Sequence, residues 1–368
     1  MTRRRRRGAA EAPSVALAGH ARARGLCVAA VAAVALVGLA QLTGSLDSLE
    51  RASVSTRFAL RDVPPPTDIV IVKIDDRTFG ELNKPWPLSR SLHARVIDRL
   101  HAAGAREIVY GVQFTEPRTP AEDGDLYDAV GAAGNVTLAT SQSDAQGRTN
   151  VLGGDANLAR VHARAAAANL TTSEGGVIAH YPYEVSHLKS LAVVAAERAG
   201  GKPLSQSRFP GGNALIDYRG GAGTFRSVPF WQVLRGDVPA SVFRDKIVVV
   251  GATAPSLQDF HATPTSGSDL MPGPEVQANA IWTALRGNPL TSAPGWIAML
   301  AMLVAALLAP LAALRLGLVR ATQIAVVAVV AYVAAAKLLF DGGIIVELSG
   351  PVSSMMTPSS NSSFAATA

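Results

Sequence analysis

Hydrophobic residues gather in three long stretches that carry almost no charge. The first covers residues 26–42, the second 295–314 and the third 321–340, where Lys337 lies within a turn of the end. A membrane-spanning helix needs about 20 apolar residues, and a core helix of a soluble protein normally keeps a polar face. We therefore predict transmembrane helices over residues 26–43, 294–314 and 321–340.

Two details of this arrangement stay open. The first stretch also has the features of a secretory signal peptide, with arginines before it and a poor cleavage site near Ala40. Residues 341–368 form either a tail or a degenerate fourth helix that begins at Ile344, although Gly350 and Pro351 are unfavourable inside a helix. The prediction is three to four transmembrane helices.

The arginines predict the orientation in the membrane. Residues 1–25 hold seven arginines and one acidic residue, so this segment has a charge of +6, which is the net charge of the whole chain. The rest of the chain has equal numbers of basic and acidic residues. Arg315 and Arg320 flank the short connection between the second and third stretches. Basic residues favour the cytoplasmic side. We therefore expect the basic tail to lie in the cytoplasm and residues 44–293 to lie outside it. The chain is then a multi-pass protein of the bacterial inner membrane. Its expected partner is the lipid bilayer and not nucleic acid.

Between the first two apolar stretches the pattern is that of an α/β domain. Short runs rich in β-branched residues cover 69–74, 107–110, 136–139, 214–218 and 247–250, and helical spacing covers 92–100, 188–199 and 276–285. Continuous apolar runs of this length are typical of strands buried on both faces of a parallel sheet. We predict a largely parallel sheet flanked by helices. Residues 141–183 show no clear periodicity.

Three blocks of this segment resemble the CHASE2 family of extracytoplasmic sensory domains. The first is a strand that ends in Asp75 and Asp76, followed by Trp86-Pro87 and Arg90. The second covers residues 114–117 with acidic residues behind them. The third is the most specific: its members are Gly251, Thr253, Asp259, Pro264 and Gly273.

The resemblance implies a sensory receptor that relays an environmental signal across the membrane to a cytoplasmic output module. Relatives carry cyclase, kinase or diguanylate cyclase modules, and none is recognisable in this chain, so we expect no enzymatic activity in it. The chain departs from the family pattern at Gly111, where an aspartate is usual, and at residues 175–179 and Gln277. We expect an unknown small molecule or ion as stimulus, and a homodimer or a signalling protein as partner.

The predicted site lies where the strands end, because ligands of open α/β folds bind at the carboxyl ends of parallel strands. We expect Asp75, Asp76 and Asp259 to converge there with Arg90 nearby. Taken together, the predicted ligand-binding residues are Asp75, Asp76, Arg90, Thr253 and Asp259, and the predicted structural residues are Trp86, Pro87, Gly251, Pro264 and Gly273. In the alternative interpretation the acids are helix caps or partners of Arg90.

No cofactor is expected, and no metal site is assigned. The single cysteine, Cys27, excludes an intramolecular disulfide and a cysteine-ligated zinc site. A membrane-anchored hydrolase is disfavoured because the Gly-x-Ser-x-Gly elbow is missing. The remaining alternative is an envelope structural or assembly protein with a domain that no longer senses.

Overall fold

The computed structural model describes residues 47–61, 63–173, 176–267 and 269–346, together with five isolated positions between 25 and 39. The basic tail, most of the predicted first transmembrane helix and residues 347–368 lie outside the described residues. Contacts divide the chain into two units, of which one contains residues 54–291 and the other contains residues 292–346 together with the described residues before 54. Each unit is described by itself.

The larger unit is built on a six-stranded sheet in which every pairing is parallel, as predicted. The strand order is β4-β3-β2-β10-β1-β9. In chain order the strands are β1 (Ile69–Ile74), β2 (Glu107–Tyr110), β3 (Val136–Thr140), β4 (Arg164–Ala167), β9 (Arg226–Pro229) and β10 (Ile247–Ala252). The four central strands are almost wholly buried, which explains their continuous apolar runs.

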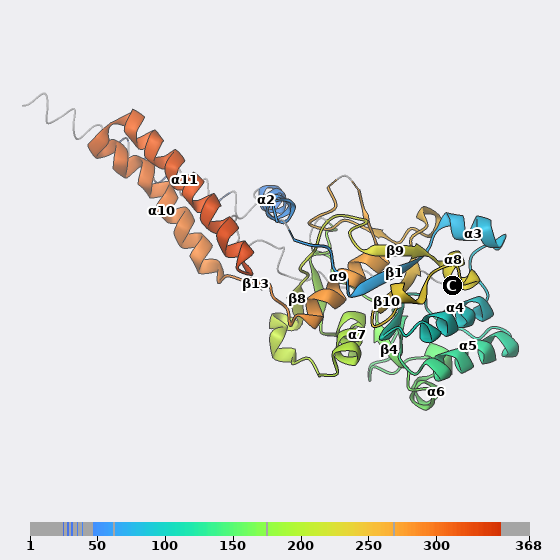
Figure 1. Cartoon of the computed structure of the whole chain (residues 1–368). Helices are drawn as coiled ribbons and strands as arrows, with labels where there is room; N and C mark the ends of the chain where they lie inside the picture. The colour runs from blue at the N-terminus through green and yellow to red at the C-terminus, as the bar shows by residue number, and fades with distance from the viewer. Residues whose placement is uncertain are drawn as a thin grey trace, which may run out of the picture. The chain divides into compact units, whose positions relative to one another are not determined.

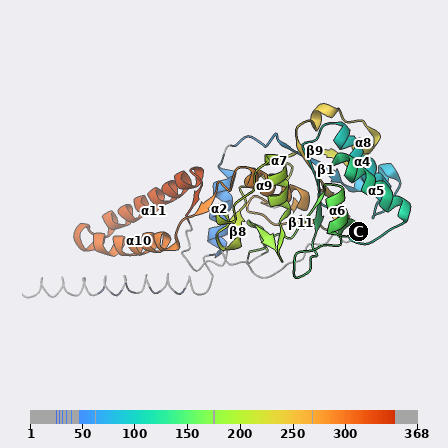
Figure 2. The ribbon, with the colours of Figure 1, turned by 90° about the horizontal axis from the view of Figure 1, so that it is seen from below.

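Helices cover both faces of the sheet (Figures 1 and 2). One face carries α3 (Asp76–Leu82), α4 (Arg90–Ala102), α5 (Pro120–Ala133), α6 (Asp155–Arg160) and α8 (Phe230–Arg235), whose apolar residues share one core cluster with the sheet. The other face carries α7 (Leu191–Gly200) and α9 (Gly273–Leu285), which contact each other and the strands. This three-layer arrangement is the expected solution for a parallel sheet with two apolar faces.

One predicted strand belongs elsewhere. Residues 214–218 were expected in the parallel sheet, but β8 (Asn213–Leu215) instead pairs antiparallel with β5 (His180–Pro182) in a separate two-stranded sheet. Ile216 and Tyr218 are buried, so their apolar character comes from burial outside the main sheet. The remaining short strands are β6 (Glu184–Val185), β7 (Leu188–Lys189), β11 (Phe260–His261) and β12 (Met271–Pro272). The 3₁₀ turns are Val151–Gly153, Gln206–Arg208, Pro210–Gly212, Ala240–Val242 and Pro255–Leu257.

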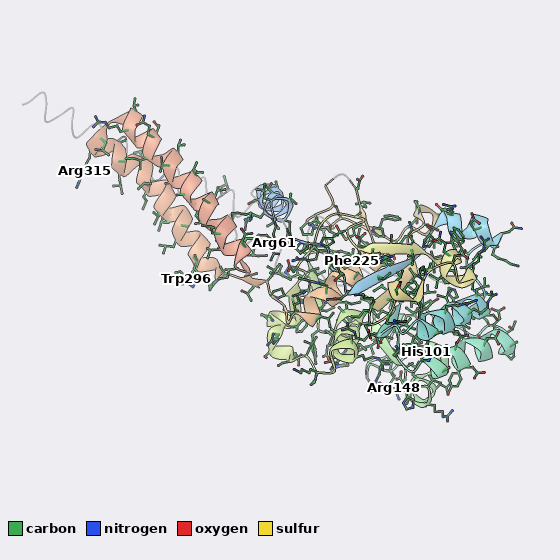
Figure 3. All side chains as sticks on the ribbon, viewed as in Figure 1. Arg61, His101, Arg148, Phe225, Trp296 and Arg315 are labelled. Atoms are coloured by element: carbon green, nitrogen blue, oxygen red, sulfur yellow. The ribbon has the colours of Figure 1, made fainter. Side chains whose placement is uncertain are left out.

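The smaller unit contains two long helices, α10 (Gly295–Leu316) and α11 (Leu318–Asp341), which pack against each other as a hairpin. Figure 3 shows Trp296 and Arg315 near opposite ends of α10. Within the described residues, Val319–Asp341 is the one segment found to be long and apolar enough to cross a membrane. A total of three to four spans therefore stays a prediction. The unit also includes the short strand β14 (Ile344–Ile345), which lies beside β13 (Thr291–Ser292), and Ala293 donates its backbone N–H to the carbonyl of Ile345 at 2.8 Å.

Candidate functional site

The strand order creates a crevice at the carboxyl edge of the sheet. Strands β1 and β2 are consecutive in this sheet along the chain but are not neighbours in it, because β10 lies between them. After β1 and β2 the chain continues into α3 and α5 on one face, whereas after β10 it continues into α9 on the other face. Ligands of open α/β sheets bind where neighbouring connections leave in opposite directions.

The aspartates after β1 have local partners. Asp75 caps α3, because its Oδ1 accepts hydrogen bonds from the backbone N–H of Thr78 at 2.9 Å and from its hydroxyl at 2.7 Å. The ammonium group of Lys73 lies 3.7 Å from the other carboxylate oxygen. Asp76 accepts a hydrogen bond from Ser256 Oγ at 2.7 Å. These contacts agree with the capping role that we gave as the alternative for Asp75.

Arg90 pairs with Asp123 and not with these aspartates, so the alternative interpretation in which the aspartates are its partners is wrong. Its Nη1 lies 2.6 Å from Asp123 Oδ1, and its Nη2 donates to the carbonyl of Glu116. Its backbone N–H donates to Glu122 Oε2 at 3.0 Å, and the guanidinium lies over the ring of Phe114. Arg90 therefore ties the start of α4 to the start of α5. The sequence could not reveal this, because the partners lie about 30 residues away and are brought close only by helix packing.

Asp259 belongs to a third group of contacts. Its Oδ1 lies 2.7 Å from His261 Nε2, and its backbone carbonyl accepts a hydrogen bond from Gly273 N–H at 2.9 Å. A side chain at Gly273 would collide with the Asp259 carboxylate, since an added Cβ would lie 2.2 Å from it. The predicted aspartates thus share one edge of the sheet, but their contacts form separate sets, and a ligand-binding role for them stays a prediction.

The remaining predicted residues support the same edge. An added Cβ at Gly251 would lie 2.4 Å from Cγ of Pro274, so only glycine lets β10 pass this close to α9. Thr253 donates its backbone N–H to the carbonyl of Ile74 at 2.9 Å, and its hydroxyl is buried without a partner among the described residues. Pro264 is buried. Trp86, which precedes Pro87, packs edge-on against Phe79.

Three hollows of this edge meet at Thr115, which belongs to the family block at residues 114–117 but was not predicted as a site residue. A small hollow of about 70 Å³ lies between the Trp86–Arg90 segment and the loop after β2. Two open clefts of about 530 and 660 Å³ adjoin it, and Thr115 lines all three spaces. We call this combined space the Thr115 cleft. It is bounded by the loops that follow β2 and β3, and Arg148 on the second loop is labelled in Figure 3.

The inner wall of the Thr115 cleft is fixed and carries no net charge. Gln113 Oε1 accepts hydrogen bonds from the backbone N–H and the hydroxyl of Ser141 at 3.1 and 3.2 Å, which ties the two loops together. His93 is fully buried, with Nδ1 2.9 Å from the Tyr110 hydroxyl. Burial, with a smaller effect of the Arg90 charge, lowers the pKa of His93 to about 3, so this imidazole is neutral. The charge of Arg90 is matched by Asp123.

The small hollow of the cleft is also lined by polar side chains without a partner. Among the described residues, the side chains of Thr115, Glu116, Arg118 and Gln142 line this hollow and have no hydrogen-bond or ion-pair partner within the protein. No group of three or more potential metal-binding side chains occurs in the part of the chain that the structure describes.

Comparison with known protein families identifies the chain. The CHASE2 domain family matches residues 29–311, which is most of the sequence. The chain belongs to the CHASE2 family. This confirms the resemblance seen in the motifs, and CHASE2 is a family of extracytoplasmic sensory domains. No curated protein and no solved structure matches the chain.

The CHASE2 domain has a second polar centre, at Asp217, which sequence reasoning also missed. The Asp217 carboxylate is buried and pairs with Arg61, which follows α2 (Asp47–Ala59), and more loosely with Arg219 at 3.5 Å. Its backbone N–H donates to Thr283 Oγ1 of α9 at 2.9 Å. The guanidinium of Arg219 lies 4.3 Å from the ring centre of Trp282, also on α9. We call this set of contacts the Asp217 junction; Arg61 is labelled in Figure 3.

Proposed function

We propose that this chain is a sensory receptor of the bacterial inner membrane, in which a CHASE2 domain outside the cytoplasm relays a signal to a cytoplasmic output module. The observation that carries the proposal is the family match over residues 29–311, because CHASE2 domains are extracytoplasmic sensory domains.

The Thr115 cleft supports the receiving half of this function. It lies at the carboxyl edge of a parallel sheet, its inner wall is held by hydrogen bonds, and its outer side chains are free to bind a ligand. Preformed concave sites with a few convergent polar groups are typical of small-molecule binding.

The Asp217 junction supports the relaying half. It joins Arg61, which follows α2 on the C-terminal side of the first apolar stretch, with α9, which is separated from α10 by nine residues. The two ends of the domain that continue toward the predicted membrane helices are thus connected through one buried carboxylate. A change in the domain that shifts α9 would displace Arg61 with it, as small shifts of packed helices do in other switches.

The proposal is tested by fusing topology reporters to the full chain at the N-terminus, after residue 150 and after Leu316. We expect the N-terminus and Leu316 to report a cytoplasmic location and residue 150 an external one. A cytoplasmic residue 150 would refute an external receptor. A domain that is external but gives no change in the accessibility of α2 or α9 with any stimulus would favour the structural envelope protein instead.

A further inference from the structure

The free charges of the Thr115 cleft indicate what kind of ligand it takes. Glu116 supplies a negative charge and Arg118 a positive charge, and neither side chain has a partner among the described residues. The two residues are separated by Pro117 alone, so their Cα atoms lie at most about 7 Å apart. One small molecule can therefore reach both charges.

The neutral groups around these charges narrow the ligand further. The amide of Gln142 and the hydroxyl of Thr115 can each donate and accept hydrogen bonds. The Gln113 amide has its oxygen occupied by Ser141, which leaves its NH₂ group available as a donor. Arg90 is already matched by Asp123, and His93 is neutral, so neither adds an unmatched charge.

The small hollow also has an apolar wall. Trp86, Pro87, Leu88, Val112 and Phe114 line it beside the polar groups, and its volume is only about 70 Å³. A space of this size holds a short side chain of the ligand, and the apolar wall gives a short apolar side chain a surface to pack against.

From this arrangement we infer that the Thr115 cleft binds a free α-amino acid with a small apolar side chain. The ligand carboxylate pairs with Arg118, the ligand ammonium pairs with Glu116, and the side chain enters the hollow beside Trp86. This inference rests on the proposed sensory function and names its ligand class. It differs from the aspartate site expected from the sequence, because none of Asp75, Asp76 and Asp259 takes part.

The test uses the full chain in lipid nanodiscs and titration calorimetry with each of the twenty standard amino acids as probes. We expect at least one with a small apolar side chain, such as alanine or valine, to bind. The analogues of that amino acid that lack either the ammonium or the carboxylate group should bind about tenfold more weakly or worse, because a charge-assisted contact is lost.

Variants locate the site. Glu116→Gln and Arg118→Gln should each weaken binding about tenfold or more, and because both side chains are exposed, they should leave thermal unfolding unchanged. Asp237→Asn and Arg244→Gln are matched controls, since both residues are exposed, lie outside the cleft and should bind normally.

The inference is overturned if no amino acid binds, if a singly charged analogue binds as tightly as the amino acid, or if the two cleft variants bind like the controls. If the topology reporters place residue 150 outside the cytoplasm, these results would refute the amino-acid site but not the proposed receptor function. An internal residue 150 would overturn the receptor itself, whatever the calorimetry shows.

Discussion

Replacement of Asp217 by asparagine tests the junction that connects the two ends of the CHASE2 domain. The carboxylate is about 1% exposed and is shared by Arg61, which is 15% exposed, and Arg219, which is 8% exposed. Asparagine keeps the size of the side chain and its hydrogen-bonding capacity but removes the charge. Two largely buried guanidinium groups would then lose the carboxylate charge that they share.

The expected loss of stability follows from this burial. Removing one partner of a buried ion pair costs about 3–5 kcal/mol. Arg61 is close enough to solvent to regain part of its hydration, so we expect the lower end, about 3 kcal/mol. For a domain of this size that corresponds to a fall in melting temperature of about 6–12 °C. The matched control, Asp237→Asn at an exposed position, should stay within about 0.5 kcal/mol of the native chain.

Thermal unfolding of the full chain, followed by circular dichroism, measures this loss. The double variant Asp217→Asn with Arg61→Gln should lose less unfolding free energy than the two single variants lose together, because each single change already removes the ion pair between Asp217 and Arg61. If Asp217→Asn unfolds within about 0.5 kcal/mol of the native chain, the carboxylate does not hold the junction, and the relay through it is refuted.

Three further predictions concern the domain core. Arg90→Ala should destabilise the domain by about 2 kcal/mol in chemical denaturation without any ligand, because the contacts to Asp123 and Glu116 are lost; an unchanged midpoint would contradict this. Burial lowers the pKa of His93 to about 3, below its unfolded value of about 6.5, so the unfolded chain binds the extra proton and stability should fall as pH drops below about 6.5. His93→Gln should flatten that dependence in pH-resolved unfolding, and an identical slope would exclude His93 as its source. Gly251→Ala should cost about 1–3 kcal/mol in the same denaturation assay, since its methyl group would collide with Pro274, and a neutral effect would show that α9 can move away.

The sequence was sufficient to predict the central strands of the sheet. The strands β1, β2, β3 and β10 are buried on both faces, so each is a continuous apolar run. The two strands that it did not predict, β4 and β9, are the edges of the sheet, where exposure permits arginine and proline. Edge strands bury less apolar surface and therefore leave a weaker pattern.

The candidate site was predictable only in its general position. Parallel strands place their carboxyl ends on one edge, so the location of Asp75 and Asp259 followed from the order of the elements. Their partners did not, because the ion pair of Arg90 with Asp123 depends on how α4 packs on α5. Thr115 and Arg118 lie in a loop without periodicity, and only the folded chain shows that they border a cleft.

Labelling of single cysteines in spheroplasts tests the central claim most directly. In a chain carrying Cys27→Ala, a cysteine is placed at Lys202, an exposed residue of the CHASE2 domain, or at Arg320, an exposed residue at the start of α11. A membrane-impermeant maleimide should label the cysteine at position 202 in intact spheroplasts and the cysteine at position 320 only after the membrane is opened. If position 202 is not labelled in intact spheroplasts, the sensory domain does not lie outside the cytoplasm. If position 320 is labelled in intact spheroplasts, the connection between α10 and α11 does not lie in the cytoplasm. Either result would contradict the account.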